Sequence, residues 1–307
     1  MIIDSNFVDS YLMPRITLEP LLFTKKNLHY SSDNENSSFS YLETQFKISY
    51  FKKARDIIKS FKSDFNLISP TLFNTSRSKY LSSCVTQILG NYELNQTKFI
   101  DLESPSKKFQ FLIGDHGFFS KTDLSNINNY DLIDDAWSIN FDVLNSISNS
   151  NKTHYFFSAP KVFNIPFGGV LFCPKYCEIN HSLSIDANSA EHKFLSSQFF
   201  KNLESFENYA TARNTNYLYL SSALDSIGLN VFFNENFTSK YPGACILKSE
   251  APFDEVKFKS YLNNYGIRGT SFFTNNAIIL PCHQFLSNFE LNYIIEVTKN
   301  ALEASFT

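Results

Sequence analysis

The spacing of apolar residues predicts alternating helices and strands along most of the chain. Apolar positions recur every three to four residues over residues 51–65, 190–226 and 288–304, which is typical of helices with one buried face. Two further helices are predicted, over residues 78–89 and 253–265, and each is followed by a glycine, Gly90 or Gly266, of the kind that ends helices. Short apolar runs predict strands at residues 65–69, 98–102, 109–113, 130–135, 244–247 and 277–280.

This order of elements predicts an α/β fold. Short apolar strands separated by helices indicate a mainly parallel sheet that helices flank on both faces. We therefore expect an irregular N-terminal segment over residues 1–45 and a large α/β domain over residues 46–225. A smaller C-terminal α+β domain is expected over residues 226–307, where the strand and helix pattern resumes after a long helical stretch.

Composition narrows the classes of protein that this chain can represent. Of its 307 residues 43% are hydrophobic and 33 are phenylalanine, which is enough for a large buried core. The net charge of −3 gives no basic field for nucleic acid. The sequence contains no apolar run of about 18–20 residues, the length that a membrane span needs, and its first residues lack the pattern of a signal peptide. We expect a cytoplasmic protein.

The five cysteines predict free thiols. They are scattered, and Cys173 and Cys177 are the only close pair. Without a second pair or a histidine cluster nearby, we expect no metal site, and reduced thiols fit a cytoplasmic protein.

One stretch, residues 155–172, stands out for its chemistry. Lys161 is surrounded in sequence by apolar residues and is followed by the pair Gly168-Gly169, although the whole chain has only 9 glycines. A glycine pair before a strand indicates a backbone constraint. Burial of the lysine among Phe157, Val162, Phe163 and Phe167 would lower its pKa and leave a nucleophilic amine. The alternative is an ordinary surface lysine in a loop between two strands.

Polar residues lie at the ends of the predicted strands 109–113 and 130–135 and of the apolar run Tyr155-Phe156-Phe157. They are Asp115-His116-Gly117, Asp134-Asp135 and the pair Ser158 and Lys161. Ligands of parallel α/β sheets bind beyond the carboxyl ends of the strands, so these residues predict a binding site. A lysine in apolar surroundings beside a carboxylate suits pyridoxal 5′-phosphate. This cofactor requires a lysine for its Schiff base and an acidic partner for its ring nitrogen.

The same segments resemble those of a known family. Residues 132–138, with Asp134-Asp135-Ala136, look like the acidic-Asp-Ala motif of the DegT/DnrJ/EryC1/StrS sugar aminotransferases, and the spacing from Lys161 to Gly168-Gly169 is similar as well. Residues 111–119 and 278–287 resemble two further segments of that family, in the same order. The resemblance covers roughly residues 45–305. It implies a fold-type-I pyridoxal-phosphate-dependent transferase, a shortened and divergent one.

The resemblance implies a role for each matching residue. Lys161 becomes the Schiff-base lysine and proton shuttle, and Asp135 the partner of the pyridine nitrogen. Ser158 becomes a ligand of the cofactor phosphate, Phe73 falls near the aromatic residue that stacks on the ring, and Ser138 stands where the family has Gln or His. From the residues alone, Asp135 could equally be a helix N-cap or a loop acid.

The function implied is amino transfer from a glutamate-like amino acid to a nucleotide-linked keto-sugar in glycan biosynthesis, by a homodimer with shared active sites. Two departures keep alternatives open. Residues 50–56 contain neither the glycine nor the hydroxyl that the family uses to hold the phosphate, although Lys53 or Arg55 could supply charge. The family's Asn-Tyr-Arg segment is missing, and Arg213 is the only arginine in that region. The alternatives are a catalytically degenerate relative that acts as a binding or partner protein, and another pyridoxal-phosphate reaction on a sugar, such as dehydration.

Overall fold

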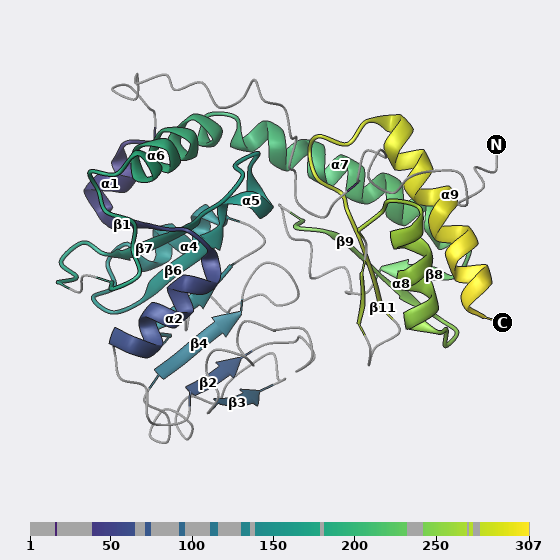
Figure 1. Cartoon of the computed structure of the whole chain (residues 1–307), viewed down its shortest axis with the longest axis horizontal. Coiled ribbons are helices and arrows are strands. Elements are labelled where there is room, and N and C mark those ends of the chain that lie inside the picture. Colours follow the sequence, from purple (N-terminus) through teal and green to yellow (C-terminus); the bar gives the residue numbers. More distant parts are fainter. Residues whose placement is uncertain are drawn as a thin grey trace. The chain divides into compact units, whose positions relative to one another are not determined.

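The chain folds into two compact units, which Figure 1 shows in ribbon form. Unit 1 comprises Met1–Pro20 and Asn208–Thr307, and unit 2 comprises Leu21–Glu207. This computed structural model describes Ile16 and residues 39–64, 71–74, 92–95, 111–115, 130–135, 139–178, 181–231, 242–268, 270–272 and 277–306.

A seven-stranded sheet forms the centre of unit 2. Its strands are β1 (Phe46–Phe51), β2 (Thr71–Asn74), β3 (Tyr92–Asn95), β4 (Phe111–Asp115), β5 (Leu132–Asp134), β6 (His154–Ser158) and β7 (Gly169–Pro174), in the order β1-β7-β6-β5-β4-β2-β3. The strands from β3 through β2, β4 and β5 to β6 pair in parallel, whereas β7 is antiparallel to both β6 and β1. The prediction of a mainly parallel sheet is confirmed.

Helices cover both faces of this sheet. Within the described residues, the helices of unit 2 are α1 (Tyr41–Gln45), α2 (Ala54–Asp64), α4 (Phe141–Ile147), α5 (Ala159–Val162) and α6 (Ala190–Leu203). On one face, Ile57 and Phe61 of α2 share an apolar cluster with Phe156 of β6. On the other, Phe199 of α6 packs against Phe157, with ring centroids 5.8 Å apart. Because successive residues of a strand point to opposite faces, β6 contributes to both layers.

The helix predicted over residues 51–65 begins later, at Ala54. Phe51, which fits the helical spacing, instead ends β1 and pairs with Gly169 of β7. This strand was not predicted, because its antiparallel partner lies more than 100 residues further along the chain. The strands predicted at residues 65–69 and 98–102 and the helix predicted over residues 78–89 lie outside the described residues.

Unit 1 contains a four-stranded antiparallel sheet in the order β10-β11-β9-β8. Its elements are β8 (Leu229–Val231), β9 (Cys245–Ser249), α8 (Glu255–Asn264), β10 (Thr270–Phe272), β11 (Ala277–Leu280), α9 (Asn288–Ser305) and α7 (Phe206–Asp225) from Asn208 onward. Gly266 has φ 76° after α8, the left-handed conformation that ends helices, as predicted. The predicted strand over residues 277–280 and the predicted last helix are confirmed, the helix extending one residue further.

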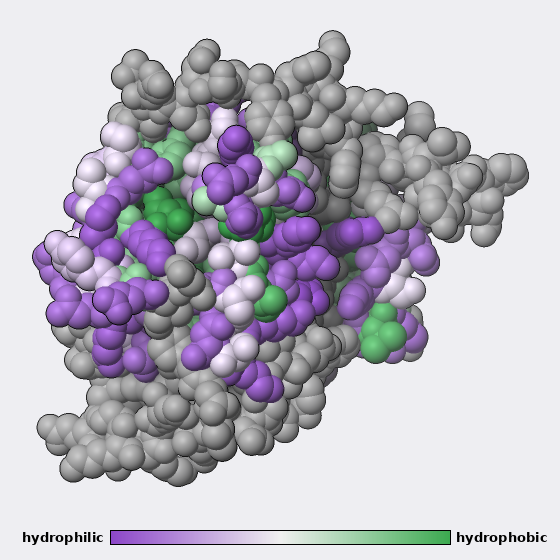
Figure 2. Space-filling view, turned by 60° about the vertical axis from the view of Figure 1, so that its left-hand side comes forward, coloured by the Kyte–Doolittle hydropathy of each residue, from purple (hydrophilic) through white to green (hydrophobic). Residues whose placement is uncertain are grey.

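One face of the protein is drawn in Figure 2. Where residues are described, the face in Figure 2 is largely hydrophilic, with separate small apolar areas between the polar ones. Among the described residues, none of the helices has both the length and the apolar character that a membrane span requires.

Candidate functional site

The carboxyl ends of the parallel strands bring acidic residues into one row. Asp115 at the end of β4 pairs with Asp134 of β5, which pairs with Phe156 of β6. Asp135 follows directly, and its backbone N–H donates to the Phe156 carbonyl over 3.0 Å. The strand pairing therefore places Asp135 and the residues after Ser158 at the same edge of the sheet, as the strand pattern predicted.

Asp135 is fully buried, and a tyrosine holds it. The Tyr155 hydroxyl donates to Asp135 Oδ2 over 2.5 Å and accepts the Asn140 backbone N–H over 2.8 Å. Both Asp135 and Tyr155 have no exposed surface. Burial, and then the negative charge of Asp135, raise the pKa of Tyr155 well above its usual value, so the hydroxyl keeps its proton and remains a donor. The carboxylate is thereby fixed in orientation.

Lys161 lies on the short helix α5, immediately after β6. The helix is anchored by the Ala159 N–H, which donates to the Gly168 carbonyl over 3.0 Å, and by the Phe163 N–H, which donates to Ala159 over 2.8 Å. Ala159, Val162 and Phe163 are buried, whereas Lys161 itself is half-buried. The predicted apolar setting is thus present on both sides of the lysine.

The glycine pair is required by packing. An added Cβ at Gly169 would lie 2.6 Å from Ala54 Cα, at the start of α2, and Gly168 has φ 120° with Leu195 Cδ2 2.7 Å from its Cβ position. Gly169 also pairs with Ser158 across β6 and β7. The start of α2 therefore lies against the same sheet edge as Ser158.

The beginning of α2 carries cations in place of small residues. Lys52, Lys53 and Arg55 are exposed around Ala54, and Lys52 forms an exposed ion pair with Glu191 at 3.9 Å. This is the segment in which the sequence lacks glycine and hydroxyl residues.

The other predicted site residues are only partly described. Ser158 is 8% exposed, and its side chain makes no capping bond to α5. Phe73 lies in β2, paired with Ile113 of β4, and only its backbone is described. Ser138 lies outside the described residues. Arg213 is buried in α7 and its Nε donates to Gln284 Oε1 over 2.6 Å.

Two features of unit 2 were missed from the sequence. One is Tyr155, whose hydroxyl contact with Asp135 arises from strand pairing. The other is a group of His154, Cys173 and His181, whose ligand atoms lie within 4.8 Å of one another. The sequence analysis found no histidine cluster near the cysteine pair, whereas the fold brings His154 and His181 to Cys173. His181, four residues after Cys177, was a signal in the sequence.

No protein-family model and no curated protein matches this sequence. Solved structures do match. A DegT DnrJ EryC1 StrS aminotransferase from Brucella abortus is similar with a TM-score of 0.56 and 14% identity, over 86% of this chain and 90% of the other. Spr1654 of Streptococcus pneumoniae, described as a sugar aminotransferase and solved in its PMP form, matches with a TM-score of 0.57, 14% identity and the same coverage. The histidinol-phosphate aminotransferase of Clostridium acetobutylicum matches with a TM-score of 0.60 and 12% identity, over 86% of each chain.

The chain has the fold-type-I fold of pyridoxal-phosphate enzymes. This confirms the predicted fold class and the structural likeness to the sugar aminotransferases. Ligands of parallel α/β sheets bind at the carboxyl ends of the strands. Asp135 and Lys161 lie at that edge of the sheet in unit 2. The matched structures differ in substrate, so the fold leaves the reaction open.

Proposed function

We propose that this protein is a pyridoxal-phosphate-dependent aminotransferase. It transfers an amino group from a glutamate-like donor to a nucleotide-linked keto-sugar in glycan biosynthesis. The observation that carries the proposal is that a buried carboxylate, held by a tyrosine, and a lysine follow two adjacent parallel strands, β5 and β6. Those are the two side chains that the cofactor's chemistry requires.

The residues at this edge fit the cofactor. Asp135 would accept a hydrogen bond from the protonated ring nitrogen, because its carboxylate is buried and its orientation is set by the Tyr155 hydroxyl. When bound, pyridoxal phosphate supplies an electron sink for the bond-breaking step. The Lys161 amine would hold the cofactor, be released by the incoming amino donor, and then carry the proton removed from the donor's α-carbon.

Neighbouring residues would contact the cofactor phosphate and the faces of its ring. We assign the phosphate to the Ser158 hydroxyl and to the start of α2, where Lys53 and Arg55 add positive charge. We assign Phe73 to a face of the ring and Ser138 to the surroundings of Asp135. Long cationic side chains replace directed N–H and hydroxyl donors there. We therefore expect the phosphate to bind more weakly, with an affinity that depends more strongly on salt concentration.

The proposal includes a homodimer with sites shared between subunits. Sedimentation equilibrium of the full chain tests this part. A monomer at micromolar concentration that nevertheless turns over substrate would show that one chain completes the site.

A second candidate function is a binding or partner protein that keeps the fold without catalysis. The cationic start of α2 favours it, because the segment lacks the small residues expected around a phosphate. Another reaction of the same cofactor on a sugar, such as dehydration, would use the same lysine.

The absorbance spectrum of the purified protein with added pyridoxal phosphate separates these functions. A bound-cofactor band near the visible edge, lost in Lys161→Ala and retained in a variant of the exposed Lys201, supports an enzyme. Borohydride reduction followed by peptide mapping should place the cofactor on Lys161. Conversion of the band by L-glutamate alone would then identify an aminotransferase. If no band forms at saturating cofactor, the enzyme proposal fails and the binding protein remains.

A further inference from the structure

Two imidazoles and two thiols gather at the opposite edge of the same sheet. His154 is the first residue of β6, and the register Tyr155↔Phe172 places it beside Cys173 of β7. Cys177 closes the turn after β7, with its N–H donating to the Pro174 carbonyl over 2.9 Å, and His181 follows. The length of β6, roughly 15 Å, separates this group from Lys161.

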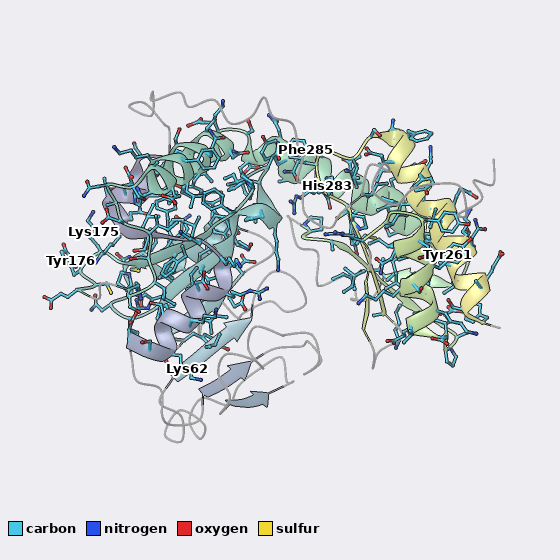
Figure 3. The ribbon with its side chains drawn as sticks, in the orientation of Figure 1. Lys62, Lys175, Tyr176, Tyr261, His283 and Phe285 are labelled. Carbon is cyan, nitrogen blue, oxygen red and sulfur yellow. The ribbon has the colours of Figure 1, made fainter. Side chains whose placement is uncertain are left out.

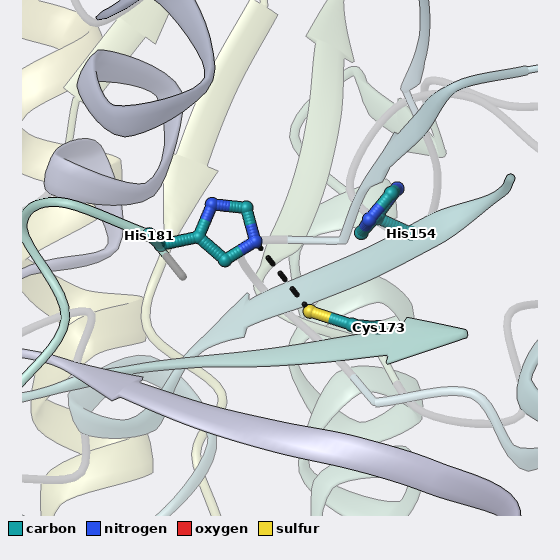
Figure 4. Close-up of side chains that lie close together, drawn as sticks. All are labelled: His154, Cys173 and His181. Atoms are coloured by element: carbon teal, nitrogen blue, oxygen red, sulfur yellow. Dashed lines mark hydrogen bonds between the residues drawn. The ribbon is translucent and has the colours of Figure 1, made fainter. Parts of the chain in front are cut away.

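Two sulfur-to-nitrogen distances within the group match the distance between two ligands of one metal ion. Cys173 Sγ lies 3.6 Å from His181 Nε2, the contact dashed in Figure 4, and Cys177 Sγ lies 3.7 Å from His154 Nε2. Zinc binds sulfur at about 2.3 Å and imidazole nitrogen at about 2.0–2.1 Å, which puts the two about 3.6 Å apart across a tetrahedral angle. Both pairs thus already have the spacing of two edges of a zinc tetrahedron.

The outer nitrogens of both imidazoles are held in the way that metal-binding histidines are held. His154 Nδ1 lies 3.2 Å from the Asp131 carbonyl oxygen, and His181 Nδ1 lies 3.3 Å from Asp64 Oδ2. A carbonyl or carboxylate oxygen only accepts, so each Nδ1 carries the hydrogen. In the neutral rings the Nε2 lone pairs therefore face the thiols, and a carboxylate or backbone carbonyl behind the ring is the usual support of a zinc ligand.

Burial and charge favour a divalent ion. His154, Cys173 and His181 are buried, and the Phe61 ring lies 4.9 Å from the His154 ring and 5.0 Å from the His181 ring. Two thiolates and two neutral imidazoles neutralise one divalent cation, so the complex carries no net charge into this apolar setting. Each thiol contacts an imidazole, as expected when all four side chains bind one ion. In a two-iron cluster with these ligands, the two cysteines would bind one iron and the two histidines the other.

We propose that His154, Cys173, Cys177 and His181 bind one Zn²⁺ in a structural site. Four protein ligands leave no open position for a substrate, which distinguishes it from a catalytic zinc. Binding replaces the two thiol protons, which pass to solvent. The ion would join β6, β7 and the segment after the turn, with α2 attached through Asp64. Cys177 is half-buried and follows the exposed residues Lys175 and Tyr176, labelled in Figure 3, so one ligand of the site lies close to the surface.

The first test is metal content and cobalt substitution of the full-length protein. After expression with zinc and dialysis, elemental analysis should find one zinc per chain. The metal-depleted, reduced protein should take up one Co²⁺ and show a thiolate-to-cobalt charge-transfer band with the strong visible bands of tetrahedral cobalt. Zinc at 100 times its Kd should raise the Tm by about 4 °C.

Variants locate the site. Cys177→Ser changes a half-buried turn residue, so the fold should survive while cobalt affinity falls at least tenfold. Asp64→Asn should keep the spectrum and weaken binding by about 10–100-fold. Cys245→Ser, which removes a buried thiol of unit 1, is the matched control and should retain full stoichiometry.

Two results would overturn the proposal. One is reduced wild-type protein that binds neither zinc nor cobalt, which would leave thiol–imidazole hydrogen bonds as the whole role of the group. The other is a Cys173–Cys177 disulfide in the protein as isolated from cells. Neither result bears on Lys161, so the zinc site and the aminotransferase proposal succeed or fail separately.

Discussion

Replacing Tyr155 with phenylalanine tests whether its hydroxyl fixes the buried carboxylate. The variant keeps the ring and its packing, and removes one donor to Asp135 and one acceptor for the Asn140 N–H. A hydrogen bond to a charged group contributes about 1.5–3 kcal/mol and a neutral one about 0.5–1.5 kcal/mol. We expect a loss of about 2–4 kcal/mol, because neither partner is replaced in a site without exposed surface.

Thermal unfolding and cofactor titration measure the two consequences. At an unfolding entropy of about 2.1 cal/mol/K per residue, 1 kcal/mol shifts the Tm of a 307-residue chain by about 1.5 °C, so the Tm should fall by about 3–6 °C. The affinity for pyridoxal phosphate should fall as well, because the carboxylate loses its fixed orientation. Tyr219→Phe is the control, since its hydroxyl donates to Asn292 on the exposed surface and its loss should change stability by less than about 1 kcal/mol.

The reasoning on Tyr155 is refuted if Tyr155→Phe and Tyr219→Phe have the same Tm as the wild type. A lower Tm with unchanged cofactor affinity would limit Tyr155 to a role in stability.

Three further changes test the packing, a buried thiol and a helix cap. Gly169→Ala should destabilise the protein by at least about 1–3 kcal/mol in urea unfolding, because its Cβ would meet the Ala54 backbone at 2.6 Å. Burial raises the pKa of Cys282 to about 12, with Arg213 opposing the rise, so at pH 8 only about one molecule in ten thousand carries the thiolate. Iodoacetamide should leave Cys282 unmodified in the native protein and alkylate it once urea unfolds the chain. Ser287→Ala should cost about 1 kcal/mol, because the Ser287 hydroxyl and Glu290 form a capping box at the start of α9.

Two of these predictions have a contrasting site. Gly228→Ala puts its Cβ no nearer than 4.0 Å to another atom, so only the strain of φ 80° should appear. Ser226→Ala removes an exposed hydrogen bond from the Ser226 hydroxyl and should leave the stability almost unchanged. Rapid alkylation of Cys282 at pH 8, or equal stability of Gly169→Ala and the wild type, would contradict the packing on which the predictions rest.

The sequence predicted those elements whose signal is local. Residues 277–280 form a strand and Asn288 begins a helix as expected, because apolar spacing reports which face of a single element is buried. The placement of Asp135 and of α5 at one sheet edge also followed, since parallel strands joined by helices have their carboxyl ends on the same side. The spacing from Lys161 to Gly169 was visible in the sequence because both residues belong to the short connection from β6 to the start of β7.

Tertiary structure decided the contacts between segments that the sequence separates. Strand β1 exists because Phe46–Phe51 pairs with β7, and its last residue, Phe51, also fits the spacing of the predicted helix. Tyr155 acquires its role only when β6 lies beside β5, and His154 reaches Cys173 only through the antiparallel pairing of β6 and β7. Hydrogen bonds and metal ligands depend on distances in space, and a linear pattern carries no information on distance until strand order and register are fixed. The sequence therefore pointed to Lys161 and Asp135 as candidate site residues, and the fold supplied the tyrosine that contacts Asp135 and the four side chains proposed to bind zinc.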